Sequence, residues 1–351
     1  MSVWRHRLFW PVLVLAALLA SNLFFAPRFF AVRLQDGHLY GSLVDIARNG
    51  APLILVALGM TLVIATGGID LSVGSVMAIS GALACVLISD LGDQNSVGGV
   101  LAAIAAALLL SLLAGVWNGL LVAVAGIQPI IATLILMVAG RGIAQLITSG
   151  QIINVRSGPY RVIGGGYALA LPVSVLIAAA AVALAVVLTR RTALGLLIES
   201  VGDSPTASRL AGIQARTLML MVYVFAAVCA GVAGLIYSSN VASADSNAAG
   251  NLIELDAILA VVIGGTALAG GRFSLAGSVL GAVIIQTLNV TCVSIGIPVE
   301  TTLLFKAIVV IILCLMQSAT FRAVVTGRFR RPPPASPSPA AAPAPRTEIP
   351  A

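Results

Sequence analysis

The sequence predicts an all-α polytopic membrane protein with about ten transmembrane helices and both termini in the cytoplasm. Of its 351 residues, 60% are hydrophobic and only 9% are charged, whereas a typical soluble domain has about 25% charged residues. Apolar runs close to the roughly 20 residues that one helical span requires recur along nearly the whole chain. A soluble fold could not bury this much apolar surface behind so few charges.

Ten apolar segments are the predicted spans. The first follows two arginines and has no small-residue cleavage site, so we expect an uncleaved helix. The segments 52–66 and 257–270 are short and run into Gly-Gly pairs, which predicts broken or re-entrant helices. The predicted spans are residues 9–25, 52–66, 72–89, 98–125, 130–148, 171–189, 217–238, 257–270, 275–295 and 302–320.

The arginines indicate the orientation. If the N-terminus lies in the cytoplasm, twelve arginines fall in cytoplasmic segments and five outside, as the positive-inside rule requires. An even number of spans then leaves the C-terminus inside. The predicted organisation is a cytoplasmic N-terminus (1–8), a transmembrane domain (9–320) and a disordered cytoplasmic tail (321–351) rich in proline and alanine.

Several classes of function are excluded by what the sequence lacks. The one lysine, Lys306, follows Phe305, so the chain has no P-loop to hold nucleotide phosphates. No histidine, cysteine or carboxylate group has metal-ligand spacing, and no pair of residues is arranged for acid–base or nucleophilic catalysis. We therefore expect no catalytic residue, metal or cofactor. The net charge of +7 is explained by arginines that flank the spans rather than by nucleic-acid binding.

Two charged residues lie where charge is costly. Asp70 stands in the segment Gly67-Gly68-Ile-Asp-Leu-Ser-Val-Gly74, and Asp70 or Ser72 could cap the helix that follows. A direct contact of either residue with a solute or a partner is the alternative. Arg141 lies near the middle of a span, where a charge costs roughly 2.5–3.5 kcal/mol. It should therefore form a buried ion pair or line a wet pathway, whereas Lys306 could reach water from its span's end.

Uncharged polar residues within or beside the spans form a second group. Hydrogen bonding between helices would explain them. The alternative is a route for a neutral sugar, which needs donors and acceptors and few charges. With Asp70, Ser72 and Arg141, the pathway candidates are Asn118, Gln128, Thr133, Gln286 and Asn289.

A short motif occurs twice, 203 residues apart. Gly67-Gly68 and Gly270-Gly271 are each followed, after five residues, by Gly-Ser-Val. Both copies lie at the cytoplasmic end of a short predicted span, which indicates a parallel internal repeat of the kind found in transporters.

The segment 190–216 is the longest predicted cytoplasmic connection. Asp203 or Ser204 can N-cap a short helix with Pro205 in its first turn, and Gly212 can end it. Such a helix could dock a cytoplasmic partner or could be a plain amphipathic surface helix. The docking candidates are Gly202, Asp203, Ala207, Arg209, Ala211 and Gly212.

Three segments together resemble the permease subunits of bacterial sugar ABC importers of the ribose/arabinose/galactose type. They are residues 59–74, the loop 192–213 and the segment 262–273. The resemblance covers about residues 9–320. It implies a multi-pass protein of the bacterial inner membrane, in which two permease subunits enclose the pathway. It further implies a periplasmic sugar-binding protein outside and ATP-binding subunits that dock on loop 190–216.

The substrate is a finer inference from the same resemblance. Residues 34–46, 132–148 and 254–265 are similar to galactofuranose permeases of this family, which implies a galactofuranose-like monosaccharide. Asp203 and Pro205 depart from the pattern of many relatives at the ATPase contact. The alternative function is an ion-coupled secondary transporter in which Asp70 is the coupling acid and the helix breaks form the ion site.

Overall fold

The computed structural model describes residues 9–25, 29–35, 37–298 and a few positions between 301 and 315. The expected N-terminus 1–8, the tail 321–351 and most of the span 302–320 lie outside these residues. The membrane helices are α1 (Phe9–Phe25), α2 (Ser42–Ala65), α3 (Val73–Ser89), α4 (Val97–Ala123), α5 (Pro129–Ile147), α7 (Val173–Arg191), α10 (Ala215–Val241), α11 (Ile253–Ile263) and α12 (Leu275–Ile295).

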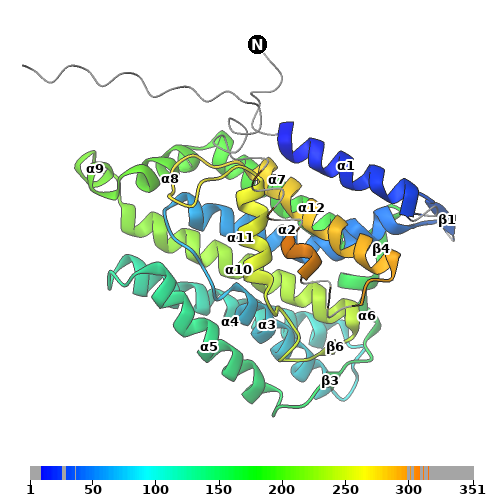
Figure 1. Ribbon diagram of the computed structural model, residues 1–351. Helices are drawn as coiled ribbons and strands as arrows, with labels where there is room; N and C mark the ends of the chain where they lie inside the picture. Colours follow the sequence, from blue (N-terminus) through cyan, green and yellow to red (C-terminus); the bar gives the residue numbers. More distant parts are fainter. Residues whose placement is uncertain are drawn as a thin grey trace, which may run out of the picture.

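Six of these helices are long and apolar enough to cross a membrane: α2, α4, α5, α7, α10 and α12. The helices α1, α3 and α11 are shorter. Among the long helices α2 and α10 are the most buried, and α10 packs against α2, α3 and α4. Figure 1 shows these helices inside the bundle, with α1 on one side and α5 on the opposite side. Large apolar side chains such as Trp117 and Leu146 are exposed on the surface of the bundle.

The helix α2 is longer than the predicted short span at 52–66. It begins at Ser42 and continues through Pro52. The hydropathy pattern did not indicate this first part because it contains polar residues. Arg48 is satisfied by the carbonyl oxygen of Gly164 and by the side chain of Asn240. By contrast, α11 is short as expected, but it runs from Ile253 to Ile263 and ends at Gly264-Gly265, before the Gly270-Gly271 pair that closes the predicted span 257–270.

The connections contain short elements that the all-α prediction missed. Three two-stranded sheets are formed by antiparallel pairs, in which Arg33 faces Tyr40, Ile153 faces Ala244 and Tyr167 faces Pro172. Two- or three-residue strands are too short for an alternating pattern to reveal them. The strands are β1 (Arg33–Gln35), β2 (His38–Tyr40), β3 (Ile153–Asn154), β4 (Tyr167–Ala168), β5 (Leu171–Pro172) and β6 (Ser243–Ala244).

Three short helices complete the connections. The helix α6 (Gly158–Gly165) lies near the strands, whereas α8 (Leu194–Asp203) and α9 (Pro205–Leu210) form the loop between α7 and α10. Figure 1 shows α8 and α9 at one end of the bundle and the labelled strands at the other. The predicted cytoplasmic and external connections therefore lie at opposite ends of the bundle.

Candidate translocation and coupling sites

A buried polar network occupies the break between α2 and α3. The Asp70 carboxylate is almost fully buried, and its Oδ1 accepts hydrogen bonds from the Ser72 backbone N–H at 2.9 Å and from the Ser72 hydroxyl at 2.6 Å. Asn118 of α4 donates from Nδ2 to the Ser72 hydroxyl at 2.8 Å. Asp70 thus stands at the start of α3, where exposed N–H groups and the helix dipole favour a negative charge. Ser72 occupies the N-cap position of α3 without a side-chain capping hydrogen bond, and Asp70 bonds to Ser72, so Asp70 holds the turn before the helix rather than capping α3.

Two polar atoms beside this network have no hydrogen-bond partner among the described residues. They are the Asn118 Oδ1 and the Tyr223 hydroxyl, both buried. A Cβ added to Gly68 would lie only 2.5 Å from the Tyr223 hydroxyl, so this tyrosine rests directly on the Gly67-Gly68 turn. A buried polar atom without a partner is costly. The network therefore has unused donor and acceptor capacity at the break. Tyr223 was not a sequence candidate, because nothing in an apolar helix marks it.

Thr133 joins the same region from α5. Its hydroxyl lies within 3.2 Å of the Ile69 carbonyl oxygen and 2.9 Å of the Pro129 carbonyl oxygen. One proton cannot serve both contacts fully, and the shorter one is the ordinary back-bond within a helix. Gln128 is not brought into the network: it is exposed at the start of α5 and makes no capping hydrogen bond.

Arg141 supports the loop that precedes α11. Its Nη1 donates to the carbonyl oxygens of Ser246 at 2.8 Å and Ala249 at 2.6 Å. The carboxylates of Glu254 and Asp245 lie near enough to attract its charge. No ion pair of Arg141 is present among the described residues. Among the described residues the arginine holds a backbone turn and does not form the buried ion pair that the sequence suggested, while its place on a wet pathway stays a prediction.

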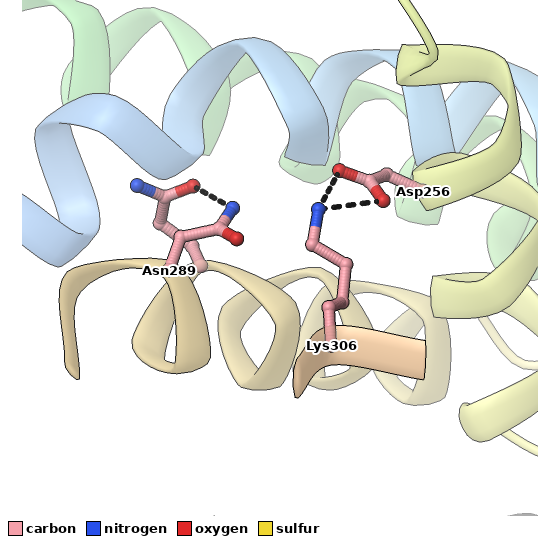
Figure 2. A network of polar contacts seen from close by, with 4 residues as sticks. Asp256, Asn289 and Lys306 are labelled. Carbon is pink, nitrogen blue, oxygen red and sulfur yellow. Dashed lines mark hydrogen bonds and ion pairs between the residues drawn. The ribbon is translucent and has the colours of Figure 1, made fainter. Parts of the chain in front are cut away.

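A second polar cluster lies where α11, α12 and the last described helical residues meet (Figure 2). The Lys306 ammonium donates to both carboxylate oxygens of Asp256, at 3.0 and 2.9 Å. The side chains of Lys306 and Asp256 are only 13% and 21% exposed. The expectation that Lys306 reaches water by extending along its span is therefore wrong. An opposite charge at the right distance stabilises the ammonium more than a partial approach to water would.

Gln286 and Asn289 belong to this cluster. Both are half-buried on α12, and the Asn289 amide donates weakly to the Gln286 oxygen at 3.4 Å. Gly50 of α2 leaves room for Gln286, whose Cγ lies 3.4 Å from where a Cβ at that glycine would stand. Figure 2 shows Asn289 beside the Lys306–Asp256 pair. The predicted pathway candidates thus fall in separate places: Asp70, Ser72, Asn118 and Thr133 lie at the α2–α3 break, and Gln286 and Asn289 lie on α12.

The helix α9 has the ends that the sequence predicted. The Ser204 hydroxyl accepts a hydrogen bond from the Ala207 backbone N–H at 3.2 Å, so Ser204 and not Asp203 is the cap. Gly212 has a φ of +83°, and the Ile213 N–H donates to the Ser208 carbonyl oxygen, which closes the helix. The docking candidates Ala207, Arg209, Ala211 and Gly212 are exposed.

Gly202 does not belong to this exposed surface. A Cβ there would lie 1.9 Å from the Ala65 carbonyl oxygen and 2.5 Å from the Gly271 nitrogen. The Gly271 N–H also donates to that same Ala65 carbonyl oxygen at 2.9 Å. The end of α8 therefore packs backbone to backbone against the end of α2. Gly202 is thus an internal contact, so a charged side chain there would disturb the fold of the permease itself and not only a docking surface.

The two Gly-Gly turns of the repeated motif lie in the same place. A Cβ on Gly270 would meet the Gly67 backbone at 3.0 Å and the Gly202 carbonyl oxygen at 3.1 Å. Gly67, Gly270 and Gly271 all have positive φ, which L side chains rarely adopt. We call the contact of Ala65, Gly67, Gly202, Gly270 and Gly271 the glycine joint. It connects the α8–α9 segment to both helix breaks, and Asp203 lies against it beside Gly271.

Comparison with known proteins identifies the chain. Residues 42–314 match the family described as "Branched-chain amino acid transport system / permease component". The chain belongs to this permease family. It is a multi-pass inner-membrane transport subunit rather than an enzyme. The sequence resemblance to import permeases is thereby confirmed. No solved structure matches the chain.

Several curated relatives are named as permeases of sugar transporters. The galactofuranose transporter permease protein YtfT of Escherichia coli K12 is 47% identical over 92% of this chain and 94% of its own length. The fructose import permease protein FruF of Bifidobacterium longum is 41% identical over 89% of this chain and 88% of its own. The ribose import permease protein RbsC of E. coli K12 is 34% identical, with coverages of 88% and 91%.

Proposed function

We propose that this permease is the membrane-spanning subunit of an ATP-driven importer for galactofuranose or a similar monosaccharide. The observation that supports the substrate best is the 47% identity, along almost the whole chain, to a permease named for galactofuranose. The relatives named for fructose and ribose are 41% and 34% identical. Every one of these sugars is neutral and rich in hydroxyls, which fits a chain whose intramembrane polar residues are mostly uncharged.

The proposed topology has ten spans with both termini in the cytoplasm. Six long helices, three shorter ones and the helical positions after residue 300 together support this number. The arginine distribution supports the sides. In a cysteine-free background, a membrane-impermeant thiol reagent added to intact spheroplasts should label Asp93→Cys and leave Thr206→Cys unlabelled. The reverse pattern would show that the orientation is inverted.

The proposed sugar route runs past the two polar regions described above. Among the described residues, Asn118 offers an unpaired oxygen beside Asp70 and Ser72, and Gln286 and Asn289 carry amides that are only weakly engaged. A sugar hydroxyl both donates and accepts hydrogen bonds, so it can pair with amide groups of this kind. Thr133 and Arg141 are assigned supporting roles, because their polar atoms are occupied by backbone carbonyl oxygens. Gln128 is left at the exposed entrance of α5.

The proposed partners follow from the two ends of the bundle. The capped, exposed helix α9 is proposed to dock a cytoplasmic ATP-binding subunit, while a periplasmic sugar-binding protein delivers substrate at the end that carries the short strands. A second permease subunit, identical or related, completes the pathway. In this proposal residues 9–320 form the permease domain, loop 190–216 is its coupling segment, and 1–8 and 321–351 are cytoplasmic extensions.

Uptake in proteoliposomes tests this function. The permease, its ATP-binding subunit and its binding protein would be reconstituted with ATP inside, and labelled galactofuranose, ribose and fructose compared. We expect ATP-dependent uptake with galactofuranose preferred, unaffected by a protonophore. Uptake that is abolished by the protonophore and indifferent to ATP would instead favour an ion-coupled transporter with Asp70 as the coupling acid. Equal uptake of all three sugars would refute the proposed substrate alone.

Docking is tested separately with two matched substitutions. Ala207→Glu places a charge on the exposed face of α9, and Gly92→Glu places one at an exposed position with nothing within 4 Å, at the other end of the bundle. We expect Ala207→Glu to lower co-purification with the ATP-binding subunit because the buried charge would have no partner. Gly92→Glu should leave it unchanged. Normal assembly of both variants with the ATP-binding subunit would show that the docking surface is not α9.

A further inference from the structure

An apolar groove runs along the outside of the bundle between α1, α2, α7 and α12. Its volume is about 590 Å³. Its wall includes Leu15 of α1, Ile54 of α2 and Val283 of α12. Among the described lining residues the only hydroxyl is that of Thr287, which donates a hydrogen bond to the Val283 carbonyl oxygen at 2.7 Å. A sugar needs hydrogen-bond partners that this groove does not have, so the groove is not part of the proposed sugar route.

The length of the groove suits a hydrocarbon chain. On α7 the lining extends from Val175 to Val186, a rise of about 16 Å at 1.5 Å per residue. Carbon atoms pack at about 3.5–4.0 Å, so an acyl chain can lie along this length in contact with the lining side chains.

A positive charge follows the groove along α7. Among the α7 residues that line it, Val175, Ala179, Ala183 and Val186 form one stripe at helical spacing, with Ala178 and Val182 beside them. The next exposed position of this stripe is Arg190, four residues after Val186 and in the last turn of α7. Arg191 lies one position further round the helix and continues the neighbouring exposed stripe through Leu184 and Val187, which does not line the groove.

We propose that this groove is a binding site for an anionic phospholipid. One acyl chain lies along α7 between α2 and α12, and the phosphate group is held by the Arg190 guanidinium. The arrangement matches the two parts of a phospholipid. The apolar groove would hold the acyl chain, and Arg190, at the end of α7, would hold the phosphate group. Because α7 leads directly into α8, a lipid held here would brace the helix that carries the coupling segment.

Native mass spectrometry tests this site with matched variants. The full-length permease would be delipidated and titrated with phosphatidylglycerol or with phosphatidylcholine. We expect wild type to prefer phosphatidylglycerol, and Arg190→Gln to weaken that lipid about fivefold, the effect of one basic residue near an anionic surface. Phosphatidylcholine binding should not change. Arg191→Gln should have a smaller effect because its stripe does not meet the groove.

A second pair of variants fills the groove. Ala183→Phe places a ring inside it, and Val187→Phe places the same ring on the neighbouring stripe. We expect Ala183→Phe to remove binding of both lipids and Val187→Phe to retain it. Retained lipid in Ala183→Phe would overturn the proposal. A loss of permease dimer in Ala183→Phe would overturn it in favour of a second copy. If Ala183→Phe does not fold, an equal loss of phosphatidylglycerol affinity in Arg190→Gln and Arg191→Gln would overturn the proposal, because the lipid would then not depend on the stripe that lines the groove.

Discussion

Gly202→Ala should destabilise the permease although it adds a single methyl group. The new Cβ would lie 1.9 Å from the Ala65 carbonyl oxygen and 2.5 Å from the Gly271 nitrogen. Both are backbone atoms, so no side chain can rotate away and α8 must shift. Forcing extra atoms into a packed region costs about 1–3 kcal/mol. Weakening the Gly271–Ala65 hydrogen bond would add about 0.5–1.5 kcal/mol.

The measurement is the thermal unfolding midpoint of the purified permease, followed by ATP-dependent uptake. We expect a Tm lowered by at least about 2 °C and uptake lowered further, because the glycine joint connects α8–α9 to both helix breaks. Gly98→Ala is the matched control: this exposed glycine of α4 has nothing within 4 Å of a Cβ. Its stability should be unchanged or slightly higher, since alanine favours helix. A Gly202→Ala protein with the Tm and uptake of wild type would refute the reasoning.

Two further substitutions test the charged residues of the membrane domain. Lys306→Leu leaves Asp256 unpaired and should lower the free energy of unfolding by roughly 1–3 kcal/mol, because the pair is largely but not fully buried. The double variant with Asp256→Leu should recover most of this loss in the same unfolding assay. Failure of the double variant to recover stability would contradict the pairing. Arg141→Leu removes the donor for the Ser246 and Ala249 carbonyl oxygens and should reduce uptake per inserted protein severalfold, a result contradicted by normal uptake.

The helices were largely predictable from the sequence because each apolar run must cross the same hydrocarbon layer. The predicted segment 275–295 coincides with α12. The start of α2 could not be predicted, since Arg48 becomes acceptable there only through Gly164 and Asn240, which are distant in sequence. The length of a helix beyond its apolar run depends on tertiary hydrogen bonds that hydropathy does not record.

The candidate sites divide in the same way. The Asp70–Ser72 turn and the Ser204 cap are formed by residues close in sequence, so residue type and spacing indicated a polar turn and a capped helix there. Contacts between distant segments were not visible: Asn118 meets Ser72 across 46 positions, and Lys306 meets Asp256 across 50. Gly202 shows the limit most clearly. Its lack of a side chain indicated a close approach, but not whether the approaching surface belongs to a partner or to the permease itself.

The glycine joint also determines how motion can pass through the molecule. Where two segments pack through side chains, small displacements are ordinarily accommodated by changes of rotamer. At the joint, the main chains of three segments touch directly, and no rotamer is available to absorb movement. In the proposed importer, a push on α9 from the cytoplasm would therefore reach the ends of α2 and α11–α12 almost undiminished. The conformational change of the ATP-binding subunits would therefore determine directly how far the chain ends at the two helix breaks move.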